Sequence, residues 1–396
     1  MKSLTFHDVE SYEPNCFWAY AKANRPFHTR VDGLSIDGNA VGLTYESAKI
    51  RAIGEAVERY AAGFRTGDQK YRFGTANEVQ AAIDPSRFIS FDDSQYIKDF
   101  PFSRPSTSSF LEWVPGENLV SKAAVYVPSQ LVYIPHQYIP EEARLDDQIS
   151  SGLACHISFE KSATKSILEV LERDAFMRAW RLSTQPTFAP DGILSEPTIQ
   201  NWLKRIEARG IEYSVGFLPD LLGASVAICV MRPRIATVPH FVCGLGSDLN
   251  PYHALLSAVE ECVQSWLGLR RMAEVGLPDF DPFDITTFTS PHRHGIAFAV
   301  RPDLASEAWN RLSASVRPHM PHQVLTLDEL LHRAAGVDRV VVVCDLTPPD
   351  VAKCGLFVTR ALVSEALALD TNANWPHLGC SLKTQRVLNT LPHPFP

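Results

Sequence analysis

Several common sequence signals are missing from this chain. The N-terminus, MKSLTFHDVESYEP, lacks the apolar core of a signal peptide, and the strongest apolar run, residues 340–344, is far too short to cross a membrane. Lys and Arg number 37 against 45 Asp and Glu, a net charge of −8, so the positive excess of a general nucleic-acid binder is absent. We expect a cytoplasmic protein that binds neither membranes nor nucleic acid.

Motifs of several enzyme and metal-binding classes are also absent. The eight cysteines include no CxxC pair, which argues against a zinc ribbon and against a compact disulfide framework. We therefore expect reduced, mostly buried thiols. The chain also has no GxxxxGK[ST] loop, no GxSxG elbow, no HExxH helix and no kinase signature. Any nucleotide site must be built in another way.

The composition, 45% hydrophobic and 21% charged over 396 residues, supports a folded core. β-branched and aromatic segments bounded by turn formers predict strands, and apolar spacing of three and four predicts helices. The expected strands are 124–134, 225–232, 240–244 and 339–346, and the expected helices are 46–64, 160–181, 253–273 and 305–317. Proline-rich segments at 100–105, 233–239 and 392–396 predict loops or edges. The result is a mixed α and β protein.

An internal duplication relates residues 37–60 to residues 151–174, at a constant offset of 114 residues and without a gap. Each copy runs from a loop with small residues into a helix that carries an ExxER signature. The identical pairs are Gly38/Gly152, Ala40/Ala154, Glu46/Glu160, Ile53/Ile167, Glu55/Glu169, Glu58/Glu172 and Arg59/Arg173.

The duplicated helices each place two carboxylates side by side, because residues three apart share a helix face. Such pairs repel unless a cation neutralises them, and their repetition suggests that both helices face one shared cationic group. Mg²⁺ takes oxygen ligands and accompanies phosphates, which favours a metal–nucleotide site. A third helix, 253–273, adds Glu261 and Gln264 at the same spacing. The alternative for any one helix is a solvated face with an intrahelical ion pair.

These motifs, taken in order, resemble the YcaO superfamily. The segments that carry the resemblance are GLTYESAKIRAIGEAVERY, SSGLACHISFEKSATKSILEVLERDAFMRAW, ALLSAVEECVQ, DLTPPDVAKCGLFVTRALV and the closing PHPFP. Within that superfamily the chain is most similar to the azoline-forming cyclodehydratases, the D component of thiazole and oxazole peptide maturases, whose chains typically end in PxPxP.

The resemblance implies an α+β YcaO fold in one domain, residues 1–396, with the duplicated loop–helix units around a central ATP/Mg cleft. It implies ATP-dependent cyclodehydration: a Cys, Ser or Thr side chain of a ribosomally made precursor peptide attacks the preceding carbonyl, ATP phosphorylates the oxygen, and loss of phosphate leaves an azoline. It also implies two sets of site residues. Metal ligands would be Glu55, Glu58, Glu169, Glu172 and Glu261, and nucleotide contacts would be Arg173, Gln264, Arg59, Ser162 and Ser166.

The proline-rich ending would ordinarily be an extended, solvated tail. The resemblance implies instead that Pro392, Pro394 and Pro396 enter the catalytic site, since preset backbone angles reduce the entropy lost on ordering. We expect deletion of residues 392–396 to abolish turnover while leaving the fold and most nucleotide affinity intact.

Two positions depart from the pattern of relatives: Arg51 stands where many carry a small or hydroxyl residue, and His156 where azoline-forming relatives often have glycine. Because only 36 residues precede Asp37, no fused E1-like domain is expected, so a separate E1-like partner would deliver the peptide. A flavin dehydrogenase could act in the same complex, and a homodimer is plausible. Alternatives are a YcaO thioamide or amidine synthetase and a non-catalytic YcaO scaffold that binds the precursor.

Overall fold

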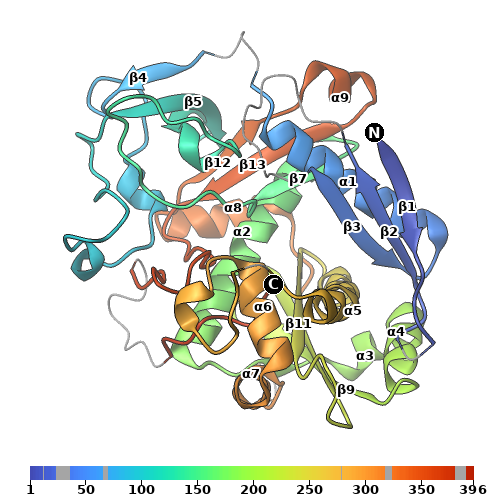
Figure 1. Ribbon diagram of the computed structural model, residues 1–396. Helices are drawn as coiled ribbons and strands as arrows, with labels where there is room; N and C mark the ends of the chain where they lie inside the picture. The colour runs from blue at the N-terminus through green and yellow to red at the C-terminus, as the bar shows by residue number, and fades with distance from the viewer. Residues whose placement is uncertain (12, 24–35, 66–69, 278, 317–322, 380–388) are drawn as a thin grey trace.

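The computed structural model describes residues 1–396 except 12, 24–35, 66–69, 278, 317–322 and 380–388. The strands described form three sheets in which neighbouring strands are antiparallel, and helices pack against each sheet (Figure 1). This confirms the expected α+β class. None of the helices in the described part is long and apolar enough to cross a membrane.

The first sheet has the strand order β1-β2-β3 and is covered by helix α1. The strands are β1 (Ser3–His7), β2 (Phe17–Lys22) and β3 (Asp37–Gly42), and the helix is α1 (Tyr45–Ala62). Alanines at every fourth position, Ala48, Ala52 and Ala56, are completely buried and let the helix lie close to the sheet. At Gly38 a Cβ atom would lie 1.9 Å from the Ala52 carbonyl oxygen, so only glycine fits there.

The second sheet has the order β4-β5-β12-β13-β7, with β6 also paired to β5. Its strands are β4 (Arg72–Gly74), β5 (Leu111–Asn118), β6 (Ala123–Pro128), β7 (Leu153–His156), β12 (Val341–Asp345) and β13 (Phe357–Val363). Helix α2 (Phe159–Leu182) packs across β7 and β13, and α8 (Leu327–Gly336) shares the same apolar core. Short helices η1 (Pro85–Phe88), η2 (Asp93–Gln95), η3 (Ser129–Leu131) and α9 (Pro349–Lys353) lie in the connections.

The third sheet has the order β11-β10-β9-β8 and supports helix α5. Its strands are β8 (Thr187–Phe188), β9 (Ile211–Leu218), β10 (Ser225–Pro233) and β11 (Val242–Asp248), and the helix is α5 (Pro251–Val275). The remaining helices are α3 (Asp191–Leu194), α4 (Pro197–Glu207), η4 (Ile285–Thr287), α6 (Pro291–Val300) and α7 (Pro302–Leu312). In Figure 1 the C-terminus lies near the centre of the molecule, beside α6.

The structure contains three strand–cap–helix units, one on each sheet, where the sequence analysis found two. In each unit a strand is followed by a polar residue that caps the next helix: Thr44 before α1, Ser158 before α2 and Asn250 before α5 all accept a hydrogen bond from a backbone N–H of the first turn. Each unit also has a tightly packed glycine in its strand or directly before it, Gly38, Gly152 and Gly244, and a Cβ at Gly244 would lie 2.2 Å from the Cys262 nitrogen. Each helix then carries a glutamate eleven residues after its cap.

Most of the expected elements are present, with shifted ends. The strand expected over 124–134 stops at Pro128, because Ser129 begins a 3₁₀ turn in which its carbonyl accepts from the N–H groups of Val132 and Tyr133. The strand expected over 240–244 runs over 242–248 instead. The helix expected over 305–317 begins at Pro302 and ends at Leu312, since the next segment pairs with the loop before β8 through the Ser315 N–H and the Pro186 carbonyl.

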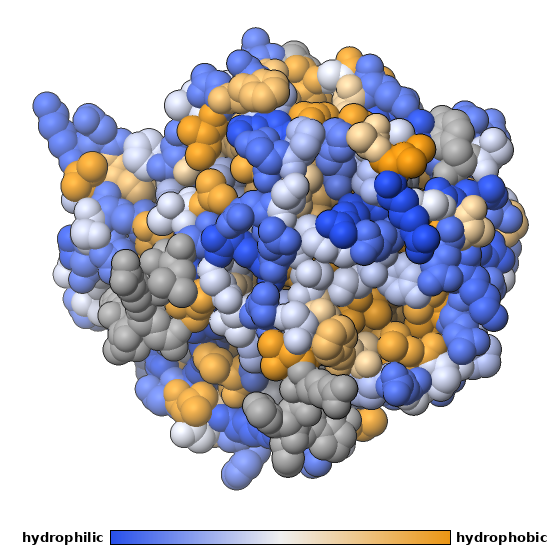
Figure 2. Space-filling model, turned by 90° about the horizontal axis from the view of Figure 1, so that it is seen from below, coloured by the Kyte–Doolittle hydropathy of each residue, from blue (hydrophilic) through white to orange (hydrophobic). Residues whose placement is uncertain are grey.

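The described cysteines are free thiols, and most are buried, as expected. Cys380 lies outside the described residues. On the face seen in Figure 2, hydrophilic residues are mixed with small separate patches of hydrophobic ones.

Candidate nucleotide and metal site

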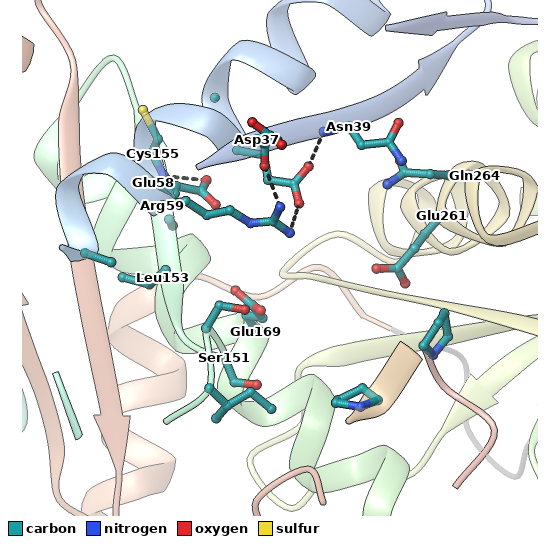
Figure 3. A pocket seen from close by; sticks show the side chains of 18 of the residues that line it. Asp37, Asn39, Glu58, Arg59, Ser151, Leu153, Cys155, Glu169, Glu261 and Gln264 are labelled. Atoms are coloured by element: carbon teal, nitrogen blue, oxygen red, sulfur yellow. Dashed lines mark hydrogen bonds and ion pairs between the residues drawn. The ribbon is translucent and has the colours of Figure 1, made fainter. Parts of the chain in front are cut away.

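A cavity of about 1610 Å³ lies where α1, α2 and α5 converge. This volume exceeds the roughly 300–1,000 Å³ typical of small-molecule pockets, so it has room for more than a nucleotide. Figure 3 shows glutamates from all three helices around one open space. The expected residues that line it are Glu55, Glu58, Arg59, Glu169, Glu172, Arg173, Glu261, Gln264 and Pro396.

Glu55 is held by its own helix and by the strand before it. Its Oε2 accepts a hydrogen bond from the backbone N–H of Asn39 at 2.6 Å, and its Oε1 accepts one from Arg59 Nη2 at 2.5 Å. The Arg59 guanidinium also donates to the backbone carbonyl of Asp37. Arg59 is therefore fixed at the cavity wall, with Glu55 as its counter-ion.

Glu58 and Glu169 face each other from α1 and α2. Glu58 Oε1 accepts a hydrogen bond from the backbone N–H of Cys155 at 2.8 Å. Burial, followed by repulsion from Glu169, raises the pKa of Glu58 well above its ordinary value. Burial likewise raises the pKa of Glu169 to about 7, although Arg173 opposes the shift. The positive charges near these two carboxylates are therefore too few to neutralise them.

Glu261 completes the carboxylate set from α5. Its Oε2 accepts a hydrogen bond from the backbone N–H of Leu245 at 2.5 Å, as Glu55 does from Asn39. Burial raises the pKa of Glu261 to about 8, and repulsion from Glu172 adds to the shift against the attraction of Arg173. The third unit therefore presents its glutamate to the cavity in the same way as the first.

Arg173 lies among these carboxylates. Its guanidinium contacts Glu172 and lies 3.5 Å from Glu169, and its Nε is buried without a hydrogen-bond partner among the described residues. Behind the same wall, Arg360 of β13 is 5% exposed and donates from Nη2 to the Ile149 carbonyl at 2.7 Å. The Nε and Nη1 of Arg360 have no partner within the described part of the chain.

This donor set fits a magnesium–nucleotide complex. The under-neutralised carboxylates suit a divalent cation, and the partly unpaired guanidinium of Arg173, which lines the cavity, suits phosphate oxygens. In the part of the chain that the structure describes, no three His, Cys, Asp or Glu side chains are gathered as a ready-made metal cage. Mg²⁺ does not require one, because it is usually held by one or two carboxylates together with phosphates and waters.

Two of the expected nucleotide contacts do not line the cavity. Ser162 is fully buried, donates to the Ala154 carbonyl at 2.8 Å and lies 2.9 Å from Thr359 Oγ1. Ser166 is equally buried and donates to the Ala163 carbonyl. Both serines join α2 to β7 and β13, so the expectation that they contact the nucleotide is corrected.

The proline-rich ending is buried rather than solvated. His393 is fully buried and donates a hydrogen bond from Nε2 to the Asp370 carbonyl, 2.8 Å away, and Phe395 is 4% exposed. Phe395 and Pro396 line the cavity, whereas Pro392 and Pro394 are buried outside its lining. The ending therefore approaches the carboxylates through its last two residues.

Arg51 and His156, the two residues that depart from the pattern of relatives, have distinct environments. Arg51 forms an ion pair with Glu260 and so links α1 to α5 at the cavity wall. His156 lines the cavity near Cys155, and its Nδ1 accepts a hydrogen bond from the Ile157 N–H at 2.9 Å.

The sequence analysis missed Asn39, Arg360 and His292, which only the fold brings to the site or close behind its wall. The capped helix start at Asn250, eleven residues before Glu261, was a signal that could have revealed the third unit.

Comparison with known proteins settles the family. A family model described as "YcaO cyclodehydratase, ATP- and Mg²⁺-binding" matches residues 39–367. The chain belongs to the YcaO family. This assignment confirms the expected resemblance and the expected cofactors, ATP and Mg²⁺.

One sequence relative and two solved structures are similar to this YcaO protein. An uncharacterized protein from Methanothermobacter thermautotrophicus is 28% identical over 246 residues, which are 60% of this chain and 59% of that protein. A heterocyclase solved in complex with substrate and cofactor has a TM-score of 0.78 at 21% identity, over 100% of this chain and 55% of that one. The YcaO protein of Methanopyrus kandleri, solved with AMPPCP and Mg²⁺, has a TM-score of 0.63 at 19% identity, over 100% of this chain and 90% of that one. The chain thus spans little more than half the length of the first two.

A further neighbour was solved as part of an assembly. The E. coli microcin synthetase McbBCD complex includes a chain with a TM-score of 0.64 at 15% identity, over 99% of this chain and 96% of that one. At such identities the likeness establishes the fold, and the substrates and partners named for these proteins remain theirs.

Proposed function

We propose that this YcaO protein is an ATP-dependent cyclodehydratase that forms thiazolines or oxazolines in a ribosomally made precursor peptide. The observation that carries the proposal is the meeting, in one cavity, of glutamates from three units with the last two residues of the PHPFP ending. A carboxylate-rich nucleotide site alone would suit any ATP-using YcaO protein. The ending inside that site favours the azoline-forming class.

Each group in the cavity has a role in this reaction. Glu58, Glu169, Glu172 and Glu261 would hold Mg²⁺ directly or through water, with Glu55 orienting Arg59. Arg173 and Gln264 would contact the nucleotide phosphates. When bound, Mg²⁺-ATP supplies the phosphoryl group that turns the amide oxygen into a leaving group, with the metal offsetting its charge. The chain's own part is to exclude water and to fix the reacting groups in place.

The remaining volume of the cavity supports a peptide substrate. Beyond the glutamates its walls include apolar side chains such as Ile134, Leu153, Leu269 and Met272. We further propose that a separate E1-like protein delivers the peptide and that a flavin dehydrogenase can follow in the same complex. The heterocyclase and microcin synthetase neighbours were solved with substrate, or in complexes, of their own.

The deciding measurement is the intact mass of the precursor peptide encoded beside the gene, after incubation with this protein, Mg²⁺-ATP and the neighbouring E1-like protein. We expect loss of one water per modified Cys, Ser or Thr, with tandem fragmentation placing each loss at those residues. Exchange of oxygen for sulfur would assign thioamide synthesis instead. An unchanged mass in an assay that consumes ATP would contradict the proposal.

A variant shows whether the site carries the activity. Glu261→Gln removes the charge of the α5 ligand, and Glu274→Gln changes the same residue type on an exposed part of the same helix, where it pairs with Arg270. We expect the first to lose dehydration and the second to retain it.

A further inference from the structure

One end of the cavity is not explained by the nucleotide site. It lies between the second half of α5 and the first turn of α6, where Met272 and Leu269 face Thr289, Ser290 and His292. These residues add neither carboxylates nor guanidiniums, so this end does not suit a metal ion or phosphates.

The last residue of the PHPFP ending packs against this end. A Cβ atom at Gly295 of α6 would lie 2.8 Å from the Pro396 Cβ and 3.1 Å from its Cα. His292 precedes Gly295 by three residues and so shares its helix face. The imidazole of His292 therefore stands on the side of α6 that meets Pro396.

His292 is available to act on a substrate. Its side chain lines the cavity, and neither ring nitrogen forms a hydrogen bond or ion pair with another described residue. Burial against the cavity walls lowers the pKa of His292, and the positive charge of Arg59 lowers it further. The start of α6 adds the positive end of the helix dipole, which also disfavours the imidazolium. The lowered pKa of His292 favours the neutral imidazole, the form that can accept a proton.

Other cavity residues are less suited to that task. His156 uses Nδ1 to accept the Ile157 N–H, and burial raises the pKa of Cys155 to about 12. The glutamates Glu55, Glu58 and Glu261 each already accept a backbone hydrogen bond. Glu58 and Glu261 belong to the proposed cation site, and Glu55 pairs with Arg59.

We propose that His292 is a catalytic residue that accepts the proton of the peptide's attacking Cys, Ser or Thr side chain. The inference rests on the proposed function and assigns the peptide's reacting residue to the α5–α6 end of the cavity.

The chemistry balances without a further reactant. The side-chain sulfur or oxygen bonds to the preceding carbonyl carbon while its proton passes to His292. The carbonyl oxygen takes the γ-phosphoryl group of ATP, releasing ADP. The carbon–oxygen bond then breaks, phosphate leaves, and the amide N–H proton is lost as the carbon–nitrogen double bond forms. Of the two protons that the peptide loses, one ends on the phosphate and one in solvent.

The experiment compares wild type, His292→Ala and His292→Gln for dehydration of the neighbouring precursor peptide, with and without added imidazole. The control is His332→Gln, an exposed histidine on α8. General-base residues contribute typically about 10²–10⁴-fold. We expect the His292 variants to lose about 100-fold or more in rate, imidazole to restore part of the loss in His292→Ala, and Mg²⁺-AMPPCP affinity to remain within about threefold of wild type.

Retention of the wild-type rate by both His292 variants would overturn the inference, as would a loss that coincides with weakened Mg²⁺-AMPPCP binding and is not restored by imidazole. Failure of the wild-type protein itself to dehydrate the peptide would count against the proposed function. The two failures are therefore distinguishable.

Discussion

The guanidinium of Arg173 lies over the ring of Phe395, 4.3 Å from its centroid. One residue belongs to the second carboxylate helix and the other to the PHPFP ending, more than two hundred positions away in the sequence. The contact couples the nucleotide side of the cavity to the residues nearest the proposed peptide end.

Replacing Phe395 by Leu should keep the apolar burial but lose the aromatic face. A cation–π contact is worth about 0.5–2 kcal/mol, so we expect turnover to fall by roughly 2- to 30-fold as Arg173 shifts toward Glu172. Steady-state turnover with the precursor peptide measures the effect. Phe283→Leu is the matched control, because Phe283 is an exposed ring beside Arg301 and outside the cavity lining. Equal rates for both variants would show that the contact does not matter for turnover.

Gly295→Ala should displace the last residue without unfolding α6. The added Cβ would lie 2.8 Å from Pro396 and 3.1 Å from Leu269 Cδ2, so the ending must move. Alanine in a helix interior is intrinsically more stable than glycine by about 1 kcal/mol. Because this gain opposes the cost of the close contacts, the melting temperature should change little. We expect turnover to fall by about tenfold or more while nucleotide affinity is retained. In Gly336→Ala, where a Cβ meets open space at the end of α8, turnover should match wild type.

Glu261→Gln should stabilise the protein in the absence of ligands while weakening Mg²⁺-nucleotide binding. Carboxylates buried near one another repel, and removing one charge relieves that repulsion. We expect the melting temperature without ligand to rise by a few degrees and the Mg²⁺-dependent increase in melting temperature to disappear. Thermal denaturation with and without Mg²⁺-AMPPCP measures both. A variant that keeps the full Mg²⁺-dependent increase would show that Glu261 is not a ligand.

Ser162→Ala tests the correction made to the expected nucleotide contacts. The change removes the buried hydrogen bond to the Ala154 carbonyl and leaves Thr359 Oγ1 with Ser166 alone, which should cost about 1–3 kcal/mol of unfolding free energy. Affinity for Mg²⁺-AMPPCP should stay at the wild-type value. Ser306→Ala removes a comparable but exposed hydrogen bond in α7 and should cost less. If Ser162→Ala weakened nucleotide binding at full stability, the original expectation would be reinstated.

Stability should also fall at alkaline pH through His377. Burial opposes its charge, but Asp146 and Asp370 on either side, within 3.2 Å, raise the pKa of His377 to about 10. Because the unfolded value is 6.5, the folded state binds the proton more tightly, and this contribution is complete below pH 6.5 and is lost as pH rises toward 10. Denaturant unfolding at pH 6, 8 and 10 should show that loss in wild type and in His332→Gln. In His377→Gln, stability should be lower at pH 6 and the loss smaller.

The sequence predicted the carboxylate helices well, because two glutamates three residues apart lie on the same face of any α-helix. Glu55, Glu58, Glu169, Glu172 and Glu261 all line one cavity. Ser162 and Ser166 went wrong for a tertiary reason: they precede Glu169 on its own helix face, but there β7 and β13 cover that face.

The sequence predicted the third helix with Glu261 and Gln264, but not that this helix, its cap and its strand form a third copy of the duplicated unit, because the third copy shares residue chemistry with the others rather than identical residues. Thr44, Ser158 and Asn250 are different residue types, but each caps the N-terminus of its helix. Spacing could not reveal His292, which lines the cavity, or Arg360, which lies near Glu169 behind the cavity wall, since packing between distant segments places both.

The three-unit arrangement also bears on how the protein unfolds. A nucleotide held by glutamates from all three units would link them thermodynamically, because local opening of any one would forfeit the binding free energy of the whole complex. Amide hydrogen exchange should then slow together in α1, α2 and α5 when Mg²⁺-AMPPCP binds, although they pack on three separate sheets. Bound nucleotide would thus act as a shared structural element of the fold as well as a reactant.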